Sequence, residues 1–258
     1  MDNKVILISI DGMRPDGFLA CGNPFAKTMM EVGSYTLDGR TVLPSVTLPC
    51  HMSMFHSVPP ERHGITTNLY IPMARPLNGL FEQIKLYGGI CAMYYGWEPL
   101  RDVSRPGSLK YSAYLNAYIE DATDGSLTDN ALERIQQSKP DFIFLYMVET
   151  DEKGGHKSGW MSDEYLRYVS TALDNVKRVY EACRQEYTII VTADHGGHDR
   201  THGTDLPEDT TIPQFFIGPS FKPGKELIGI TILDLAPTIA QVMNIPADTE
   251  WEGKSVIA

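Results

Sequence analysis

The 258-residue chain is predicted to fold as an α/β protein, with a mostly parallel central β-sheet sandwiched by helices. Short apolar runs rich in β-branched residues alternate with longer segments of helical periodicity, which is typical of βαβ units. Several of these runs are apolar throughout, as expected of strands that are buried on both faces of a sheet. No change in composition marks a boundary, so residues 1–258 are predicted to form one domain.

The strands are justified by their apolar runs. The first, KVILISI, is apolar from its second residue and ends at an aspartate. FIFLYMV and YTIIVT repeat this pattern further along the chain and are likewise typical of buried strands. The expected strands are Lys4–Ile10, Tyr35–Val42, Gly89–Tyr95, Phe142–Val148, Tyr187–Thr192 and Phe215–Ile217.

The helices are justified by periodicity and by their ends. In the segment 164–184, Leu166, Val169, Leu173 and Val176 recur on one helical face. Thr47 is expected to cap the helix that follows it, because a threonine at this position satisfies free backbone N–H groups. The expected helices are Phe25–Val32, Leu48–Ser57, Leu77–Tyr87, Thr128–Gln137, Glu164–Arg184 and Ile232–Met243, with loops at Gly96–Pro106 and Asp121–Ser126.

Composition narrows the function classes. Acidic residues outnumber basic ones by 33 to 22, which gives a net charge of −11. A nucleic-acid polymer is therefore not an expected partner, since such binding needs a basic footprint. No apolar stretch approaches 18 residues and the N-terminus is interpreted as a strand, so neither a membrane partner nor a secretory leader is expected. The four cysteines form no CxxC pair, which predicts reduced thiols and a cytoplasmic protein. The sequence carries no signal for an oligomeric state.

Three aspartates follow three of the predicted buried strands. Asp11 comes directly after the first strand, Asp151 three residues after the fourth and Asp194 shortly after the fifth. A single aspartate at such a place is typical of a helix cap or a turn. Because parallel strands end at the same edge of the sheet, three of them predict a cluster of carboxylates there.

Histidines accompany these aspartates in two glycine-rich segments. His156 lies in DEKGGHKSGW, and His195 and His202 lie in ADHGGHDRTHGTD. Glycines allow the tight turns that bring such side chains together. With the three aspartates these histidines make six potential ligands, enough for two ions with three protein ligands each. Carboxylate and imidazole ligands suit Zn²⁺ best, with Mn²⁺ or Fe²⁺ as alternatives.

A nucleophile is predicted in TVLPSVTLPCHMSMF. Thr47 precedes a predicted helix, so its N–H and the N–H groups after it can bind anionic oxygens. A threonine hydroxyl needs a cation to stabilise its alkoxide before it becomes a good nucleophile. Ser45 and Ser53 are the alternatives.

These motifs resemble the alkaline phosphatase superfamily, and within it the nucleotide pyrophosphatase/phosphodiesterase branch. The resemblance covers residues 5 to about 245 and includes, in order, Asp11, PSVTLPCHMSMFHSVPPERHGI, Asp151 with GGHKSG, ADHGG and HGTD. It implies an alkaline phosphatase-like fold and hydrolysis of small phosphodiesters or pyrophosphates. The sulfatase relatives carry Cys or Ser in C/S-x-P-x-R, which Cys50 does not match.

The resemblance also implies a role for each residue. One zinc would be held by Asp11, Asp194 and His195 and would also hold and activate Thr47. The second zinc would be held by Asp151, His156 and His202. Thr47 would form a phospho-threonine that water then hydrolyses. His63 would be structural.

Two departures from the family pattern stand out. The family usually has Asn three residues after the nucleophile as a donor to phosphate, where this chain has Cys50. Cys50 and the backbone of Leu48 are therefore the expected substrate-binding groups. Asp151 and His156 are five residues apart instead of four, so either the glycine pair absorbs one residue or Glu152 replaces Asp151 as a ligand. Asp151 is the preferred ligand.

The sequence thus predicts a two-zinc phosphodiesterase, and two alternatives are kept. A phosphomonoesterase or phosphonate hydrolase would use the same site. A metal-binding protein that has lost catalysis would explain Cys50 and the altered spacing. A basic residue near the substrate would favour monoesters, and the candidates for it are Lys153, Lys157, Arg14 and Arg200. Aromatic residues that could stack on a substrate are Tyr70, Tyr94, Tyr95, Trp97 and Trp160.

Overall fold

A seven-stranded sheet forms the centre of the molecule in the computed structural model, which describes residue 1 and residues 3–257. The strands are β1 (Lys4–Ile10), β2 (Ser34–Arg40), β3 (Cys91–Tyr95), β4 (Leu109–Tyr114), β5 (Phe142–Met147), β6 (Tyr187–Thr192) and β7 (Thr211–Ile217). Their order across the sheet is β2-β7-β6-β1-β5-β3-β4. β7 runs antiparallel to both of its neighbours, and the other paired strands are parallel. The predicted mostly parallel sheet is confirmed.

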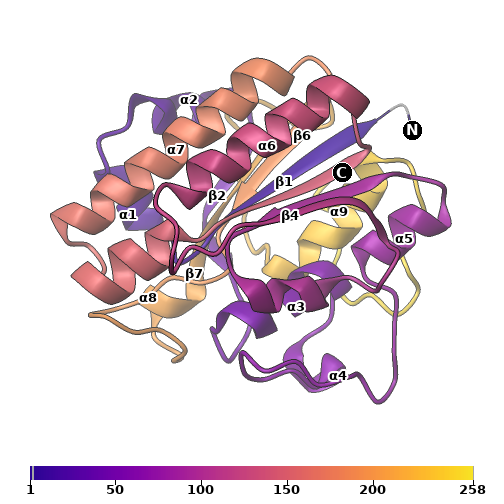
Figure 1. The fold of residues 1–258 in the computed structure, drawn as a ribbon, viewed down its shortest axis with the longest axis horizontal. Coiled ribbons are helices and arrows are strands. Elements are labelled where there is room, and N and C mark those ends of the chain that lie inside the picture. Colours follow the sequence, from indigo (N-terminus) through magenta and orange to yellow (C-terminus); the bar gives the residue numbers. More distant parts are fainter. Residues whose placement is uncertain (2, 258) are drawn as a thin grey trace.

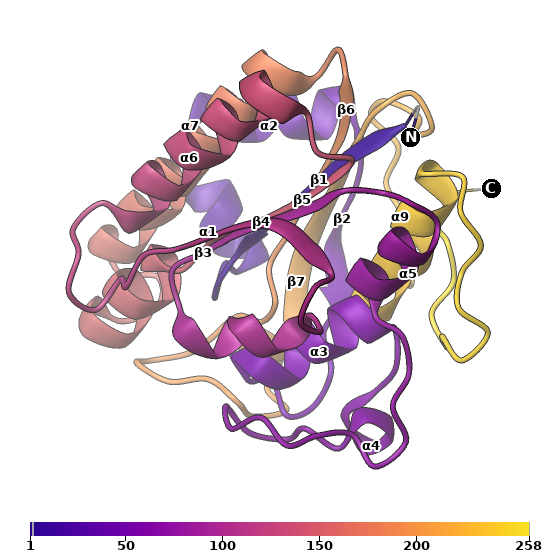
Figure 2. The same cartoon turned by 45° about the vertical axis from the view of Figure 1, so that its right-hand side comes forward.

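Helices cover both faces of this sheet (Figures 1 and 2). One face carries α1 (Pro15–Ala20), α2 (Pro24–Val32), α6 (Thr123–Ser138) and α7 (Asp163–Cys183). The other carries α3 (Thr47–His56), α5 (Leu80–Leu86) and α9 (Leu235–Val242). Short elements complete the chain: α4 (Pro60–His63), α8 (Pro207–Thr210), the 3₁₀ helices η1 (Glu98–Val103) and η3 (Ile232–Asp234), and the π-helical turn η2 (Thr150–His156).

The core lies between the sheet and these two helical layers. Every residue of β5 and β6 is buried, as expected of central parallel strands. Within the described residues, no helix is both long enough and apolar enough to cross a membrane. All four cysteines are free thiols, and three of them are buried.

Several elements differ from the sequence-based prediction. β4 was not predicted, because this edge strand alternates half-buried and exposed residues and contains no apolar run. η1 occupies the predicted loop 96–106. α6 begins at Thr123, inside the second predicted loop, where Gly125 and Ser126 obscured the helical pattern. Thr47 is the first residue of α3, and the N-cap is Val46, so the predicted capping role of Thr47 is wrong.

Candidate metal centre

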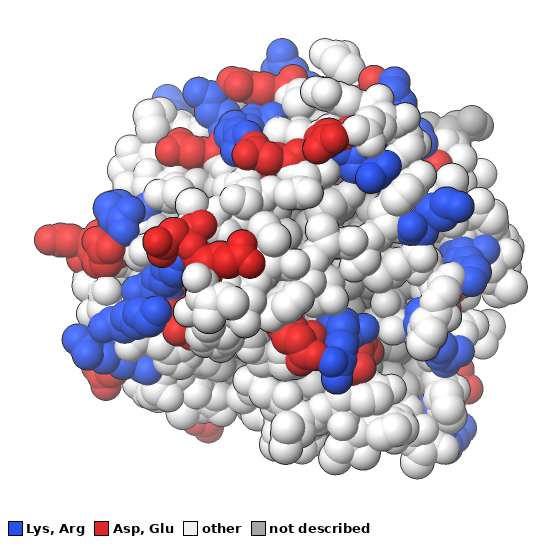
Figure 3. All heavy atoms as spheres, in the orientation of Figure 1, with Lys and Arg blue, Asp and Glu red and all other residues white. Residues whose placement is uncertain are grey.

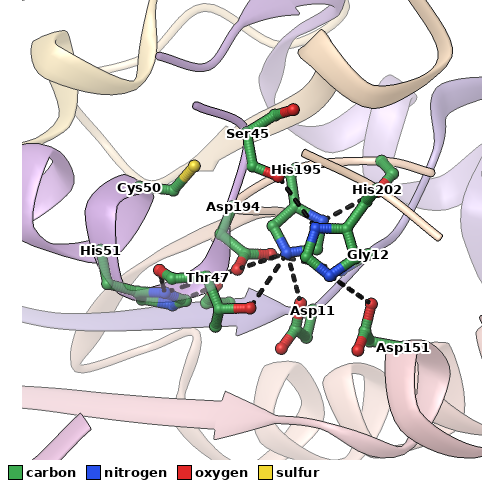
Figure 4. Close-up of polar contacts among 12 residues, drawn as sticks. Asp11, Gly12, Ser45, Thr47, Cys50, His51, Asp151, Asp194, His195 and His202 are labelled. Carbon is green, nitrogen blue, oxygen red and sulfur yellow. Dashed lines mark hydrogen bonds and ion pairs between the residues drawn. The ribbon is translucent and has the colours of Figure 1, made fainter. Parts of the chain in front are cut away.

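The carboxyl ends of β1, β5 and β6 bring the three predicted aspartates together. These strands are adjacent and parallel, with β1 paired to both of the others. Asp11, Asp151 and Asp194 are all buried at this edge of the sheet. Figure 4 shows their carboxylates converging with the side chains of Thr47, His195 and His202. The clustering expected from three parallel strand ends is therefore present.

The first group of ligand atoms surrounds Nε2 of His195. This nitrogen lies 3.2 Å from Asp11 Oδ1, 3.4 Å from Asp194 Oδ2 and 3.1 Å from Thr47 Oγ1. His195 Nδ1 lies 2.8 Å from the carbonyl oxygen of Gly196, which is placed to accept its proton. With the proton on Nδ1, the lone pair of Nε2 faces the carboxylates and is a ligand for a cation.

The second group is centred on Asp151. Its Oδ2 lies 3.3 Å from His156 Nε2, and its Oδ1 lies 4.0 Å from His202 Nε2. Nδ1 of His156 and Nδ1 of His202 each lie 2.9 Å from a backbone carbonyl, of Arg200 and Ser45 respectively. Both imidazoles therefore present Nε2 to the centre, in the same way as His195. One ligand atom each of Asp151, His195 and His202 also lie within 4.8 Å of one another, so His195 borders both groups.

The electrostatics of this centre require a positive charge. Asp11 Oδ1, Asp151 Oδ1 and Asp194 Oδ2 are buried and have no hydrogen-bond partner among the described residues. Burial and the repulsion from neighbouring carboxylates raise the pKa of Asp11 far above its ordinary range, and burial raises the pKa of Asp194 to about 7. Unpaired buried carboxylate oxygens are costly, and a divalent cation offsets that cost. The donor set, three carboxylates and three imidazoles, fits two ions such as Zn²⁺.

The extra residue between Asp151 and His156 is accommodated by a π-helical turn. Residues i and i+5 are hydrogen-bonded neighbours in a π-helix, and such turns are frequent at functional sites. η2 spans Thr150–His156, so Asp151 and His156 come to the same side of the turn. Glu152, the alternative ligand, lies 3.6 Å from Lys157 Nζ. The structure thus brings Asp151 to the centre and shows how the five-residue spacing is absorbed.

Gly155 is required by the packing of this turn, and Gly155→Ala is expected to weaken the second site selectively. A Cβ at Gly155 would lie 2.5 Å from the Trp160 ring, which itself packs against His156 and His202. Displacing Trp160 moves both histidines. A disturbance of residues that orient metal ligands typically lowers metal affinity by about 10–100-fold. Zinc content after dialysis should fall from two ions per chain toward one.

Gly125→Ala is the matched control for this prediction. A Cβ at Gly125, inside α6, would meet no atom within 4 Å. This variant should keep both ions and gain slightly in stability, since alanine restricts the unfolded chain. Two tightly held ions in Gly155→Ala would show that the π-helical turn does not control the second site.

A layer of polar residues behind the ligands holds them in place. The Tyr146 hydroxyl donates to Asp11 Oδ2. His51 Nδ1 donates to the Thr47 carbonyl (2.8 Å), and His51 Nε2 lies 3.1 Å from Ser9 Oγ on β1. Burial lowers the pKa of His51 to about 3, so this imidazole is neutral and bonds through both nitrogens. His51 thereby ties the start of α3 to the strand that carries Asp11, a role that the sequence alone did not reveal.

The metal cavity, of about 70 Å³, lies over these ligands and is lined by Asp11, Thr47, Asn68, Trp97, Tyr118, Tyr146, Val148, Asp151, Glu152, His156 and His202. Thr47 is the only predicted nucleophile that lines it. Ser45 Oγ donates to the Thr204 carbonyl, and Ser53 Oγ lies 3.0 Å from His63 Nε2 in a buried contact. The two serine alternatives are therefore engaged elsewhere.

Cys50 is not in the metal cavity, so the substrate-binding role predicted for it is corrected. Its buried Sγ lies 3.2 Å from Thr41 Oγ1 and points away from the ligands in Figure 4. Asn68 lines the cavity instead, and its Oδ1 accepts a hydrogen bond from the Leu48 N–H at 3.0 Å. The Leu48 backbone thus orients Asn68. No local signal pointed to Asn68, since it lies 21 residues from Thr47 in an exposed loop.

The aromatic residues divide between packing and the cavity. Trp160 is buried, and its Nε1 donates to the Gly12 carbonyl, so it supports the turn after Asp11. Tyr94 and Tyr95 are buried, whereas Trp97 lines the metal cavity. Tyr118, which was not predicted, lines it as well.

Comparison with known proteins gives two family matches. A family model described as type I phosphodiesterase / nucleotide pyrophosphatase matches residues 5–83, and one described as metalloenzyme superfamily matches residues 109–247. A 2,3-bisphosphoglycerate-independent phosphoglycerate mutase of Clostridium botulinum is 30% identical over 148 residues, which are 55% of this chain and 27% of that protein. Ectonucleotide pyrophosphatase/phosphodiesterase family member 3 of Rattus norvegicus is 26% identical over 217 residues, 74% of this chain and 24% of that protein. The chain spans about a quarter of the length of these relatives.

Solved structures share the fold at lower identity. Human ectonucleotide pyrophosphatase / phosphodiesterase 5 superposes with a TM-score of 0.82 at 15% identity, covering 98% of this chain and 97% of that one. A phosphonate monoester hydrolase from Silicibacter pomeroyi gives a TM-score of 0.76 at 15% identity, covering 98% and 76%. These likenesses agree with the fold built from the strand order above.

Proposed function

This chain belongs to the metalloenzyme superfamily, whose fold is that of alkaline phosphatase, and from that premise we propose that it hydrolyses small phosphodiesters with two divalent cations and Thr47 as nucleophile. One observation carries the proposal. Thr47 Oγ1, at the start of α3, lies 3.1 Å from the same His195 nitrogen around which Asp11 and Asp194 converge. A hydroxyl held among unpaired carboxylate oxygens is placed to become a nucleophile when a cation occupies the centre.

The two groups of ligands would each hold one ion. Asp11, Asp194 and His195, with Thr47, would hold the first, and Asp151, His156 and His202 the second. Zn²⁺ is the preferred ion for these carboxylate and imidazole donors, and Mn²⁺ is the alternative. When bound, the ions would supply positive charge that stabilises the Thr47 alkoxide and the phosphoryl oxygens.

Thr47 carries the covalent step in this proposal. Its Oγ1 forms a bond to phosphorus while the bond from phosphorus to the leaving alcohol breaks. Water then cleaves the phospho-threonine, which releases a phosphomonoester and restores Thr47. A threonine-to-alanine variant of a murine structural neighbour is described as inactive and in complex with AMP, which supports a nucleophilic threonine and a phosphoester ligand.

Asn68 would bind an oxygen of the phosphoryl group. Because its Oδ1 already accepts from the Leu48 N–H, its amide NH₂ is left to donate into the metal cavity. Such a donor typically contributes about 2.7–4 kcal/mol to transition-state stabilisation. Asn68 therefore takes the role that the sequence-based hypothesis gave to Cys50.

The charge of the metal cavity favours diesters over monoesters. No lysine or arginine is among its lining residues. Lys153 pairs with Glu149 and Lys157 with Glu152, while Arg14 pairs with Asp16. A monoester dianion needs more positive charge than a diester monoanion, and these side chains do not supply it.

A phosphonate monoester is the second candidate substrate. It carries a single negative charge, as a diester does, and a phosphonate monoester hydrolase is among the structural neighbours. The hypothesis of a catalytically inactive metal-binding protein loses its main motive, since Asn68 supplies the donor that Cys50 cannot. We propose a small substrate and not a nucleic-acid polymer, because the net charge is −11 and acidic as well as basic side chains lie on the visible face (Figure 3).

The proposed function is tested by comparing the hydrolysis of a diester, bis-p-nitrophenyl phosphate, with that of a monoester, p-nitrophenyl phosphate. Protein stripped of metal and then titrated with Zn²⁺ or Mn²⁺ should recover turnover and prefer the diester. Preference for the monoester would move the assignment to a phosphatase. Two bound ions without turnover of either compound would contradict the proposal.

A further inference from the structure

A second cavity, which we call the side cavity, has no role in the chemistry described so far. It measures about 340 Å³ and shares no lining residue with the metal cavity. Apolar side chains, among them Met52, Met73 and Leu77, make about half of its wall, and polar residues that include Asp102 and Arg105 make the rest. A cavity of this size, with an apolar part and several polar groups, can hold an organic ligand.

Three segments of the chain extend from the metal cavity to the side cavity. α3 contributes Thr47 to the first and Met52 to the second. The loop after α4 contributes Asn68 to the metal cavity and Tyr70 to the side cavity. The segment containing η1 contributes Trp97 to the metal cavity and Asp102 to the side cavity. At 1.5 Å per residue, Met52 lies about 8 Å along the helix from Thr47. The side cavity therefore lies farther along α3 than the metal cavity.

From this geometry we infer that the side cavity binds the apolar ester group that stays on phosphorus when Thr47 attacks. The inference rests on the proposed function. In an in-line displacement, the leaving oxygen departs opposite to the attacking one. α3 lies on the side of the nucleophile, so a group lying beside α3 belongs to the retained ester and not to the leaving alcohol.

His56 adds a polar contact at the far end of this cavity. It is 5% exposed, and its Nδ1 lies 3.0 Å from the Met52 carbonyl, which accepts its proton. Nε2 lies beside Gly79, where an added Cβ would be 2.9 Å away, and it makes no hydrogen bond with the described residues, which leaves it as an acceptor. Burial lowers the pKa of His56, which keeps the imidazole neutral. An apolar group that extends along the apolar part of the wall and ends in a hydroxyl would donate to His56.

Alkyl p-nitrophenyl phosphates with ethyl, hexyl and octyl chains test the inference on the zinc-loaded protein. All three release the same p-nitrophenolate, so differences in KM among them report on the ester group that stays on phosphorus. KM should fall about threefold to fourfold for each methylene that enters the cavity. An 8-hydroxyoctyl ester should bind about fivefold more tightly to wild-type protein than to His56→Phe.

Met73→Trp fills the cavity from its exposed side, and Ile71→Trp is the matched control. Ile71 is on the same loop, is 59% exposed and does not line the side cavity. Met73→Trp should abolish the chain-length dependence and weaken binding of octyl phosphate in calorimetry at least tenfold. Ile71→Trp should leave the chain-length dependence of KM and the affinity for octyl phosphate unchanged.

The outcomes separate this inference from the proposed function. Turnover that is equal for the ethyl and octyl esters, with octyl phosphate bound equally by Met73→Trp and wild-type protein, would overturn the side-cavity assignment alone. Absence of turnover for every diester, with two ions bound, would contradict the proposed function. Calorimetric binding of octyl phosphate still reports on the cavity in that case.

Discussion

Thr47→Ala is expected to reduce kcat for bis-p-nitrophenyl phosphate by about 10⁶-fold, the scale seen when a covalent nucleophile is removed. The reason is geometric, because Thr47 Oγ1 is the hydroxyl that contacts the His195 nitrogen at the centre of the first ligand group. The measurement is steady-state turnover with metal content determined on the same sample.

Thr47→Ser is the control for this prediction. Serine retains the hydroxyl, so this variant should keep measurable turnover and allow a phospho-serine to be trapped by acid quench. The change to alanine should leave at least the second ion in place, since Asp151, His156 and His202 are untouched. Unchanged turnover in Thr47→Ala would eliminate the covalent mechanism.

Removal of metal is expected to destabilise the protein strongly. A ligand present at 1,000 times its Kd contributes about 4 kcal/mol to the free energy of unfolding. In a chain of this size that corresponds to a shift in Tm of roughly 10 °C for one ion. Differential scanning fluorimetry of stripped and zinc-loaded protein measures it. Equal Tm values under both conditions would show that the carboxylate cluster does not hold zinc.

The stripped protein should also lose stability as the pH rises from about 6.5 to 9. Contact with the Asp151 carboxylate raises the pKa of His156 to about 9, above its unfolded value. Within this pH range the folded protein therefore keeps a proton that the unfolded chain has released, so the free energy of unfolding falls with pH. Asp11, whose pKa is raised by burial, adds to this loss in the same direction.

Asp11→Asn separates the two contributions to this pH dependence. It removes one buried carboxylate, so the stripped variant should show a smaller loss of stability with pH than stripped wild-type protein. In zinc-loaded wild-type protein the ion replaces these protons, and stability should not fall over this range. Urea unfolding at several pH values provides the measurement, and a stripped protein that gains stability up to pH 9 would contradict the expected sign.

Local sequence patterns predicted the framework because each central strand carries its own signal. β5 and β6 are apolar throughout, and their ends place Asp151 and Asp194 without reference to the rest of the chain. The edge strand β4 and the start of α6 were missed, since exposed alternation and glycine weaken the local signal. Predicted boundaries elsewhere moved by a few residues, as at α5 and β7.

The candidate ligands were chosen from the sequence, but their grouping was decided by packing. The π-helical turn that unites Asp151 and His156 depends on Gly155 packing against Trp160. His195 borders both ligand groups, although the sequence-based hypothesis placed it in one only.

The sequence by itself determined the sheet except for its edge strand β4, the three strand-end aspartates, the histidines beside them and Thr47, because short-range periodicity and strand ends encode them. Only the tertiary structure replaced Cys50 with Asn68, brought His51 and Tyr146 behind the ligands and formed the side cavity along α3. These contacts join segments that are distant in the chain, or depend on which side of α3 a residue occupies. Which of them meet depends on how the helices pack on the sheet, which no local pattern specifies.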